Sequence, residues 1–215
     1  MSTSFGAPDI RHAGDRALLL VPSEGDLDAS VAALRAAELT GMQDFLPAAR
    51  TILITLQPGV DRASVERGLR RLLTGTHPIQ RGTASTADEV VVPVRYDGAD
   101  LAEVAARLGI SVEALIERHS SRVWRCRFIG FTAGFGYLES PGAQLTVPRR
   151  AQSRTAVPPG SVALADGYCA VYPRRSPGGW QLIGSTDLSM WDPNRERPAL
   201  LSAGTPVRFT AVDRP

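Results

Sequence analysis

Turn signals at short, regular intervals constrain the fold of this chain more than any other feature of its sequence. They consist mainly of glycine and proline, and they fall at Pro141-Gly142, Pro158-Pro159-Gly160, Asp166-Gly167, Pro177-Gly178-Gly179 and Ala203-Gly204. The β-forming runs around them predict short strands over 123–129, 144–147, 161–165, 168–173, 180–185 and 206–212. Many short strands at even spacing are typical of a β barrel or a compact β sandwich.

The first of these strands has an alternating pattern. Trp124, Cys126 and Phe128 are expected on one face, and Arg125 and Arg127 on the other. Because successive side chains of a strand point to opposite faces, the pattern predicts a half-exposed antiparallel strand.

Two helices are expected just before this strand, after another strand over 89–96. Asp100 and Ser111 are the predicted N-caps, and Gly109 ends the first helix. His119 falls on the apolar stripe of the second helix. This position leaves two interpretations open: a core histidine bonded to a backbone carbonyl, or a histidine that points from the helix end into a pocket.

The N-terminal part of the chain has a different pattern. Residues 9–21 predict two short strands around a turn, and the apolar run 51–56 predicts a buried strand. Asp26 and Asp61 are each followed by apolar residues at helical spacing, so each is a candidate helix cap. We therefore expect a small α+β sandwich of the ferredoxin-like kind.

A polar, turn-forming stretch separates these two parts. Residues 75–88 are rich in small and polar side chains, as is typical of a linker. The sequence thus predicts a small α/β domain over residues 1–80 and a mainly β domain over residues 81–215.

Composition narrows the classes of function. The net charge of +2 gives no electrostatic argument for a nucleic-acid partner. All 24 basic residues are arginine, which coding bias explains as readily as anion recognition. Cys126 and Cys169 do not form a metal-binding pair, and there are only three histidines, so no metal site is expected. The apolar runs are too short to cross a membrane, and we expect a cytoplasmic protein with reduced thiols.

The first candidate constellation is the glycine-aromatic loop over 130–138. Phe131, Phe135 and Tyr137 alternate there with glycines. Glycine allows a close backbone approach, so the loop could line a cleft. A tight corner between barrel strands, with its aromatic side chains in the core, is an equally good interpretation.

Two arginine-containing segments form the other candidates. Arg149 and Arg150 follow a proline, and Arg154 comes shortly after them. Guanidinium groups bind carboxylates and phosphates through paired hydrogen bonds, although a solvated basic loop would look the same. The segment from Tyr172 to Trp180 adds an aromatic residue at each end of a Pro-Gly-Gly turn.

These motifs resemble the KipI family, which is also called allophanate hydrolase subunit 1 and the B subunit of 5-oxoprolinase. The matching segments are VPVRYDG (92–98), ERH (117–119), GFTAGFGYL (130–138), PRR (148–150), VPPGSVALA (157–165), YPRRSPGGW (172–180), LIGSTD (182–187) and PALLSAGTPVRF (198–209). The resemblance covers the chain from about residue 9 onward and is densest over 90–210.

The resemblance implies an α/β N-terminal domain and a cyclophilin-like β-barrel C-terminal domain. It implies a component of an ATP-dependent amidohydrolase that opens the cyclic amide 5-oxoproline to glutamate and works only as part of a complex. The implied partners are a KipA-like protein, which is the C subunit of such complexes, and a further A subunit; ATP is required by the complex. Two alternatives follow from the same family: an inhibitor of a histidine kinase, and a protein related to urea carboxylase.

The resemblance also implies roles for individual residues. Catalytic roles fall on His119, Arg149 and Arg150, and substrate-binding roles on Phe131, Phe135, Tyr137, Arg154, Tyr172 and Trp180. The chain departs from the family pattern at Ala133, Ser153, Tyr168, Cys169, Ser185 and Asp187. These departures leave a paralogue with an altered substrate, or one with a structural role, as further possibilities.

Overall fold

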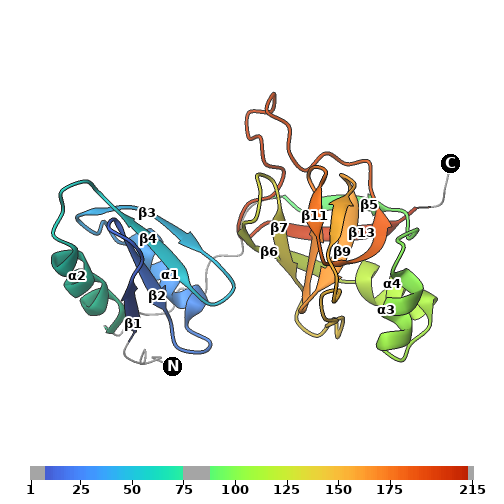
Figure 1. Cartoon of the computed structure of the whole chain (residues 1–215), viewed down its shortest axis with the longest axis horizontal. Helices are drawn as coiled ribbons and strands as arrows, with labels where there is room; N and C mark the ends of the chain where they lie inside the picture. Colours follow the sequence, from blue (N-terminus) through green and yellow to red (C-terminus); the bar gives the residue numbers. More distant parts are fainter. Residues whose placement is uncertain (1–7, 75–87, 213–215) are drawn as a thin grey trace. The chain divides into compact units, whose positions relative to one another are not determined.

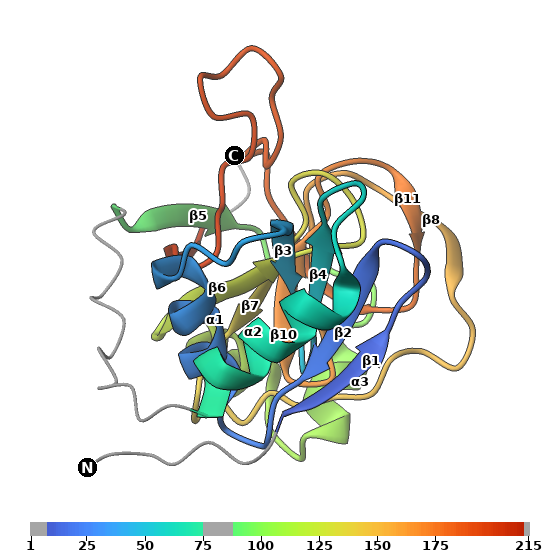
Figure 2. The ribbon, with the colours of Figure 1, turned by 90° about the vertical axis from the view of Figure 1, so that its left-hand side faces the viewer.

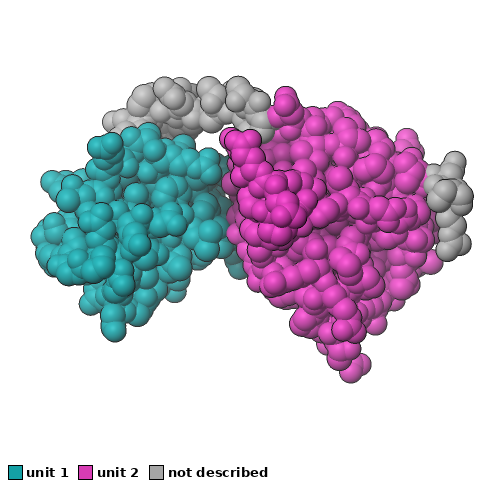
Figure 3. Space-filling model, turned by 90° about the horizontal axis from the view of Figure 1, so that it is seen from above, with its two compact units in different colours: residues 1–84 teal, residues 85–215 magenta. Residues whose placement is uncertain are grey.

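The computed structural model describes residues 8–74 and 88–212. The chain divides into two compact units, residues 1–84 and 85–215, which Figure 3 draws in different colours. The predicted boundary between residues 80 and 81 lies outside the described residues.

The described part of the first unit, residues 8–74, forms a four-stranded sheet with two helices. Its elements are β1 (Asp9–His12), β2 (Ala17–Val21), α1 (Leu27–Ala36), β3 (Met42–Pro47), β4 (Ile52–Leu56) and α2 (Arg62–Thr74). All pairings are antiparallel, in the order β1-β2-β4-β3. Both helices pack on the same sheet (Figure 1 and Figure 2), because Leu34 of α1 and Leu69 of α2 join the apolar side chains of β2 and β4 in one core.

The ferredoxin-like prediction for this unit is not confirmed. A ferredoxin-like chain runs β-α-β-β-α-β, whereas the described chain runs β-β-α-β-β-α, with the hairpin partner β1 at the edge. Strand β3 was not predicted, because its residues are partly or fully exposed and show no apolar run. Asp61 caps α2 through its carboxylate, which accepts from the amides of Ala63 and Ser64. Asp26 makes no such bond to α1.

Residues 88–212, the described part of the second unit, form a seven-stranded, nearly closed barrel with two helices and a short two-stranded ribbon. Its elements are β5 (Val90–Val94), α3 (Leu101–Arg107), α4 (Val112–Ser120), β6 (Val123–Ile129), β7 (Gly136–Glu139), β8 (Arg154–Val157), β9 (Ser161–Ala165), β10 (Tyr168–Val171), β11 (Ser176–Gly178), β12 (Gln181–Ser185) and β13 (Pro206–Ala211). The barrel order is β12-β9-β10-β7-β6-β13-β5, and β8 pairs with β11. Backbone bonds of 2.8 Å in both directions between Arg95 and Ser185 join the two ends of the sheet.

The barrel interior is a single apolar core. Side chains from all seven barrel strands meet there with Val104 of α3 and Leu115 of α4. Helix α3 lies against β12 and helix α4 against β13, so the helices close the core on that side. Ser111 caps α4 as predicted, since its hydroxyl accepts from the amide of Ala114 at 3.1 Å.

The strand predicted over 123–129 is confirmed as β6, but the face predicted for Phe128 is wrong, and so is the strand predicted over 144–147. A bulge between Cys126 and Phe128 breaks the alternation of β6. Cys126 pairs with Leu138 of the interior core, but Phe128 pairs with Tyr137 and stacks on it, so Phe128 lies on the outer face. Residues 144–147 form no strand, although Leu145 and Val147 are buried in the core.

Candidate functional site

Aromatic side chains gather on the outer face of the barrel strands. Phe128 stacks on Tyr137 with ring centroids 4.3 Å apart, and Trp180 meets Tyr137 edge-on at 5.5 Å. Phe135 contacts Tyr172 at 5.2 Å. Phe135, Tyr172 and Trp180, with Tyr137 packed against them, belong to a second apolar cluster outside the barrel core, together with small residues of β9 and β10. The corner interpretation of the glycine-aromatic loop fits this packing, because Phe135 is only 1% exposed, and the cleft interpretation stays a prediction.

Phe131 is the exposed member of this group. It is 60% exposed and has a φ of 63°, in the left-handed region that a bulky residue rarely adopts. Its ring still meets Phe135 edge-on at 5.3 Å. A large apolar side chain held outward on an unfavourable backbone suggests a functional contact.

The arginine segment and the Pro-Gly-Gly turn lie next to each other. The amide of Arg150 donates to the carbonyl of Gly179 at 2.7 Å, and Nε2 of Gln181 donates to the carbonyl of Pro148 at 3.0 Å. A Cβ on Gly179 would lie 2.8 Å from the Ser153 hydroxyl, so the two segments approach each other closely there. Two segments about 30 residues apart in the sequence therefore form one surface.

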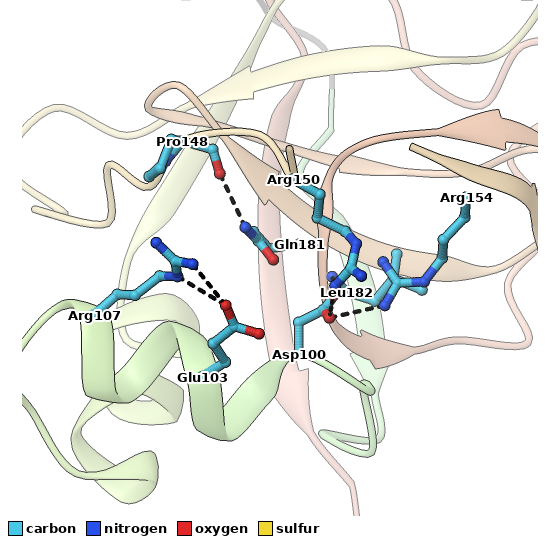
Figure 4. Close-up of polar contacts among 8 residues, drawn as sticks. All are labelled: Asp100, Glu103, Arg107, Pro148, Arg150, Arg154, Gln181 and Leu182. Carbon is cyan, nitrogen blue, oxygen red and sulfur yellow. Dashed lines mark hydrogen bonds and ion pairs between the residues drawn. The ribbon is translucent and has the colours of Figure 1, made fainter. Parts of the chain in front are cut away.

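Asp100 organises the base of this surface (Figure 4). Its Oδ1 accepts from Arg150 Nη1 at 2.7 Å and from Arg154 Nη2 at 2.8 Å. Its Oδ2 accepts from the amide of Leu182 at 2.7 Å. The Asp100 carboxylate therefore does not bond to the start of α3, and its predicted role as a side-chain N-cap is wrong.

The pKa of Asp100 reflects two opposing influences. Burial is the larger single influence and raises the pKa, because a charged carboxylate loses its hydration. The hydrogen bonds from Arg154 and from the Leu182 amide, with the charges of Arg154 and Arg150, together outweigh burial and lower it. Asp100 is thus a buried, ionised carboxylate.

Arg149 differs from the other two arginines of the segment. It is exposed, and among the described residues it has no carboxylate partner. Its charge acts on Tyr137 and Tyr172: burial raises the pKa of both phenols, and Arg149 works against that rise. Arg149 is therefore the cation of the segment that is available to a ligand.

His119 lies away from this surface, inside the barrel. It is fully buried, its Nδ1 bonds with the Tyr96 hydroxyl at 2.8 Å, and its Nε2 lies 3.2 Å from the Cys169 sulfur. Burial lowers the pKa of His119 to about 3, so the ring is neutral. The core interpretation of His119 fits this position, although its partners are side chains and not a backbone carbonyl.

Sequence reasoning missed Asp100 and Gln181 as members of the site. Asp100 has the sequence context of an ordinary helix cap, and its arginine partners come 50 and 54 residues later. Gln181 is 2% exposed, and a single glutamine beside Trp180 carries no motif that would mark it. In the described part of the chain, no group of three His, Cys, Asp or Glu side chains could hold a metal ion. No described helix is long and apolar enough to span a membrane.

The family model described as "Carboxyltransferase domain, subdomain C and D" matches residues 8–201. The chain belongs to this family. Its curated relatives are named as the B subunit of 5-oxoprolinase. The relative from Escherichia coli O157:H7 is 50% identical over 123 residues, which are 56% of this chain and 56% of the relative. The relative from Bacillus subtilis (strain 168) is 38% identical over 126 residues, 57% of this chain and 52% of the relative.

Similarity to the family extends to solved structures. The chain matches the crystal structure of TTHA0988 with a TM-score of 0.74 and 35% identity, over 94% of this chain and 40% of that one. The Kluyveromyces lactis urea amidolyase matches with a TM-score of 0.76 over 95% of this chain and 15% of that one; at 16% identity it shares the fold. The matched segments cover only about half the length of the curated relatives.

Proposed function

We propose that this chain is a component of an ATP-dependent amidohydrolase complex that opens 5-oxoproline to glutamate. The names of its relatives support a place in a 5-oxoprolinase-like complex. The barrel, which we take to be of the cyclophilin-like kind, would act together with a KipA-like C subunit and with an A subunit. We assign ATP to the complex as a whole, because this sequence contains no lysine and so no glycine-rich phosphate loop of the Gly-Lys-Ser/Thr type.

The observation that carries this proposal is the state of Arg149. It is exposed and unpaired among the described residues, whereas Arg150 and Arg154 are bound to Asp100. A 5-oxoproline molecule carries one carboxylate, and a guanidinium can hold it through two parallel hydrogen bonds. Arg149 is therefore the residue that we assign to the substrate carboxylate.

The aromatic residues would shape the rest of the site. Tyr137 and Tyr172 lie within electrostatic reach of Arg149, and Phe135 and Trp180 are packed beneath them. Buried aromatic side chains supply rigid apolar walls for the methylene groups of a small ring. We assign Phe135, Tyr172 and Trp180 to support of Tyr137, since all three are almost fully buried, whereas Tyr137 is partly exposed.

The partner protein would approach from the side of Phe131. This residue and Trp191 are exposed large apolar side chains on neighbouring segments, because a Cβ on Gly134 would lie 2.9 Å from Trp191 Cβ. Exposed aromatic residues are common anchors of protein interfaces. A partner seated there would exclude water from the site beside Arg149.

His119 would have a structural role inside the barrel. Both of its ring nitrogens already have protein partners, and no part of the side chain is exposed. We therefore assign it to holding Tyr96 and β10 in place, and we do not assign it the proton transfer that the family resemblance implied.

Reconstitution tests the proposal. The purified chain is mixed with its KipA-like partner, the A subunit, ATP and 5-oxoproline, and glutamate is measured. We expect glutamate only when all components are present, and matched reactions that each lack one component serve as controls. An intact assembly that releases no glutamate would contradict the proposal.

A further inference from the structure

Asp100 holds three separate segments of the second unit together. Its own backbone amide donates to the carbonyl of Leu182 at 2.9 Å, and its carboxylate accepts from the amide of the same residue. The carboxylate also binds Arg150 and Arg154 from the segment before β8 and from β8 itself. The start of α3, the start of β12 and the arginine segment thus meet at one side chain.

We propose that Asp100 is a positioning residue that decides which arginine of the segment can bind an anion. It ties Arg150 and Arg154 down and leaves Arg149 as the anion-binding arginine. This inference rests on the proposed function, because it concerns the same surface.

Burial makes this ion-paired arrangement stable. The Asp100 side chain is 3% exposed, against 32% for Arg150 and 23% for Arg154. An ionised carboxylate at such a position is stable only when it is paired and hydrogen-bonded. Both of its oxygens are used, one by the arginines and one by the Leu182 amide. Asp100 is too deeply buried to contact substrate, so it would act through the arginines.

The anchored Arg150 fixes its neighbour. The Arg150 amide is bonded to Gly179, and the same glycine lies beside Arg149: a Cβ built there would be 3.8 Å from Arg149 Nε. Arg149 and Arg150 are adjacent in the chain, so a fixed Arg150 backbone limits where the Arg149 guanidinium can reach. Asp100 would thus set the position of Arg149 without touching it.

The charges of the arginine segment are consistent with Arg150 and Arg154 binding Asp100 and Arg149 binding an anion. Two arginines bind the one carboxylate and Arg149 adds a third positive charge, so the segment keeps an excess of positive charge after Asp100 is paired. Within residues 8–74 and 88–212, Arg150 Nε and Arg154 Nη1 are also buried without a hydrogen-bond partner. These described residues therefore offer no spare acceptor to replace Asp100, and removing its charge would release both arginines.

Arginine-selective labelling tests the pairing directly and needs no partner protein. The folded chain is treated with phenylglyoxal, and the modification rate of each arginine is followed by peptide mass spectrometry. We expect Arg149 to react at least about tenfold faster than Arg150 and Arg154, which corresponds to holding each of them by about 1.4 kcal/mol. Equal rates for the three arginines in the wild-type chain would overturn the inference.

The same labelling experiment on the Asp100→Asn variant tests whether the Asp100 charge holds the two arginines. It keeps the shape of the side chain and removes its charge, so we expect Arg150 and Arg154 to label at rates close to that of Arg149. Glu103→Gln on the same helix is the matched control: it removes a half-exposed pair with Arg107 and should leave all three rates unchanged. If Asp100→Asn does not fold, equal labelling rates in the wild-type chain would still overturn the inference.

Kinetics in the reconstituted complex separate positioning from general stability. We expect Asp100→Asn to raise the KM for 5-oxoproline about tenfold with kcat nearly unchanged, because a misplaced Arg149 weakens substrate binding by about 1.4 kcal/mol. Loss of active protein at constant KM would show a purely structural role and overturn the inference. A wild-type complex without turnover would contradict the proposed function, while the labelling result would still report on Asp100.

Discussion

The two faces of the barrel strands place polar groups in opposite situations. On β7, Leu138 points into the barrel core and the adjacent Tyr137 points to the outer aromatic cluster. Inside, His119 is buried and neutral. Outside, Asp100 is buried and ionised because two guanidiniums and an amide hold it. The difference shows that burial of a titratable side chain does not by itself indicate a functional site. The better indicator is a side chain near the surface that stays ionised, as Asp100 does.

The two faces of the barrel strands therefore call for different measurements. A neutral, buried histidine links stability to pH, whereas a network of ionised groups links ligand binding to charge. The variants below therefore pair a change on one face with a change on the other, in order of decreasing expected effect.

The largest effect is expected from the pH dependence of the interior. The pKa of His119 lies far below its unfolded value of about 6.5, so the unfolded chain binds a proton that the folded chain rejects. Stability should therefore fall as the pH decreases from about 6.5 towards about 3, by about 1.4 kcal/mol per pH unit. Urea denaturation from pH 7 to pH 5 measures this slope.

His119→Gln serves as the comparison for that slope, because glutamine does not titrate. Its free energy of unfolding should be lower at pH 7 but should depend less on pH. His12→Gln is the matched control, since His12 is largely exposed and should leave the slope unchanged. Parallel curves for the wild-type chain and His119→Gln would contradict the neutral, buried state.

The next effect is expected from Arg149→Gln on the outer face. Loss of a charge-assisted contact of about 1.5–3 kcal/mol should lower kcat/KM of the reconstituted complex by about 10- to 100-fold. The melting temperature should not change, because Arg149 has no ion-pair partner among the described residues. Arg175→Gln, an exposed arginine in the neighbouring segment, should leave kcat/KM unchanged.

Two tyrosine-to-phenylalanine substitutions compare the faces directly. Tyr96→Phe removes the bond to His119 Nδ1, and a buried polar atom left without a partner costs about 1–3 kcal/mol of stability. Tyr172→Phe removes a hydroxyl near Arg149, so we expect a loss of about two- to tenfold in kcat/KM. Melting curves and kinetics are measured on both variants. A larger loss of kcat/KM in Tyr96→Phe than in Tyr172→Phe would contradict the assignment of binding to the outer face.

The smallest effect on stability is expected at Phe131. Glycine adopts its left-handed backbone without strain, so Phe131→Gly should change stability by no more than about 1 kcal/mol. If the exposed ring contacts the partner protein, the same variant should weaken assembly, which sedimentation or light scattering would detect. Assembly at wild-type affinity would remove Phe131 from the proposed interface.

Local patterns predicted most of the elements. Ser111 and Asp61 were found as helix caps because a capping side chain lies within three residues of the amide that it accepts from. The turns at Asp166-Gly167 and Pro158-Pro159-Gly160 marked β9 and β10 for the same reason, since turn conformations depend on the residues within them. The bulge in β6 was not predicted, because it depends on pairing with β7.

The site was only partly predictable. The sequence and its family resemblance pointed to the arginine segment and to the aromatic residues around it, and the structure brings Arg149, Tyr137 and Tyr172 together. Neither indicated that the three arginines would differ from one another. That difference depends on Asp100, whose contacts span 50 to 82 positions along the chain.

The sequence by itself determined the family, the helices, most strands and the segments that carry the candidate site. These depend on periodicity, turn chemistry and motifs, which are properties of neighbouring residues. Only the tertiary structure decided that His119 lies inside the barrel and Phe128 outside it. It also decided that Asp100 holds Arg150 and Arg154, while Arg149 has no ion-pair partner in the described part of the chain. Closure of the barrel brings distant segments into contact, and the burial and charge pairing that result exist only once the chain has folded.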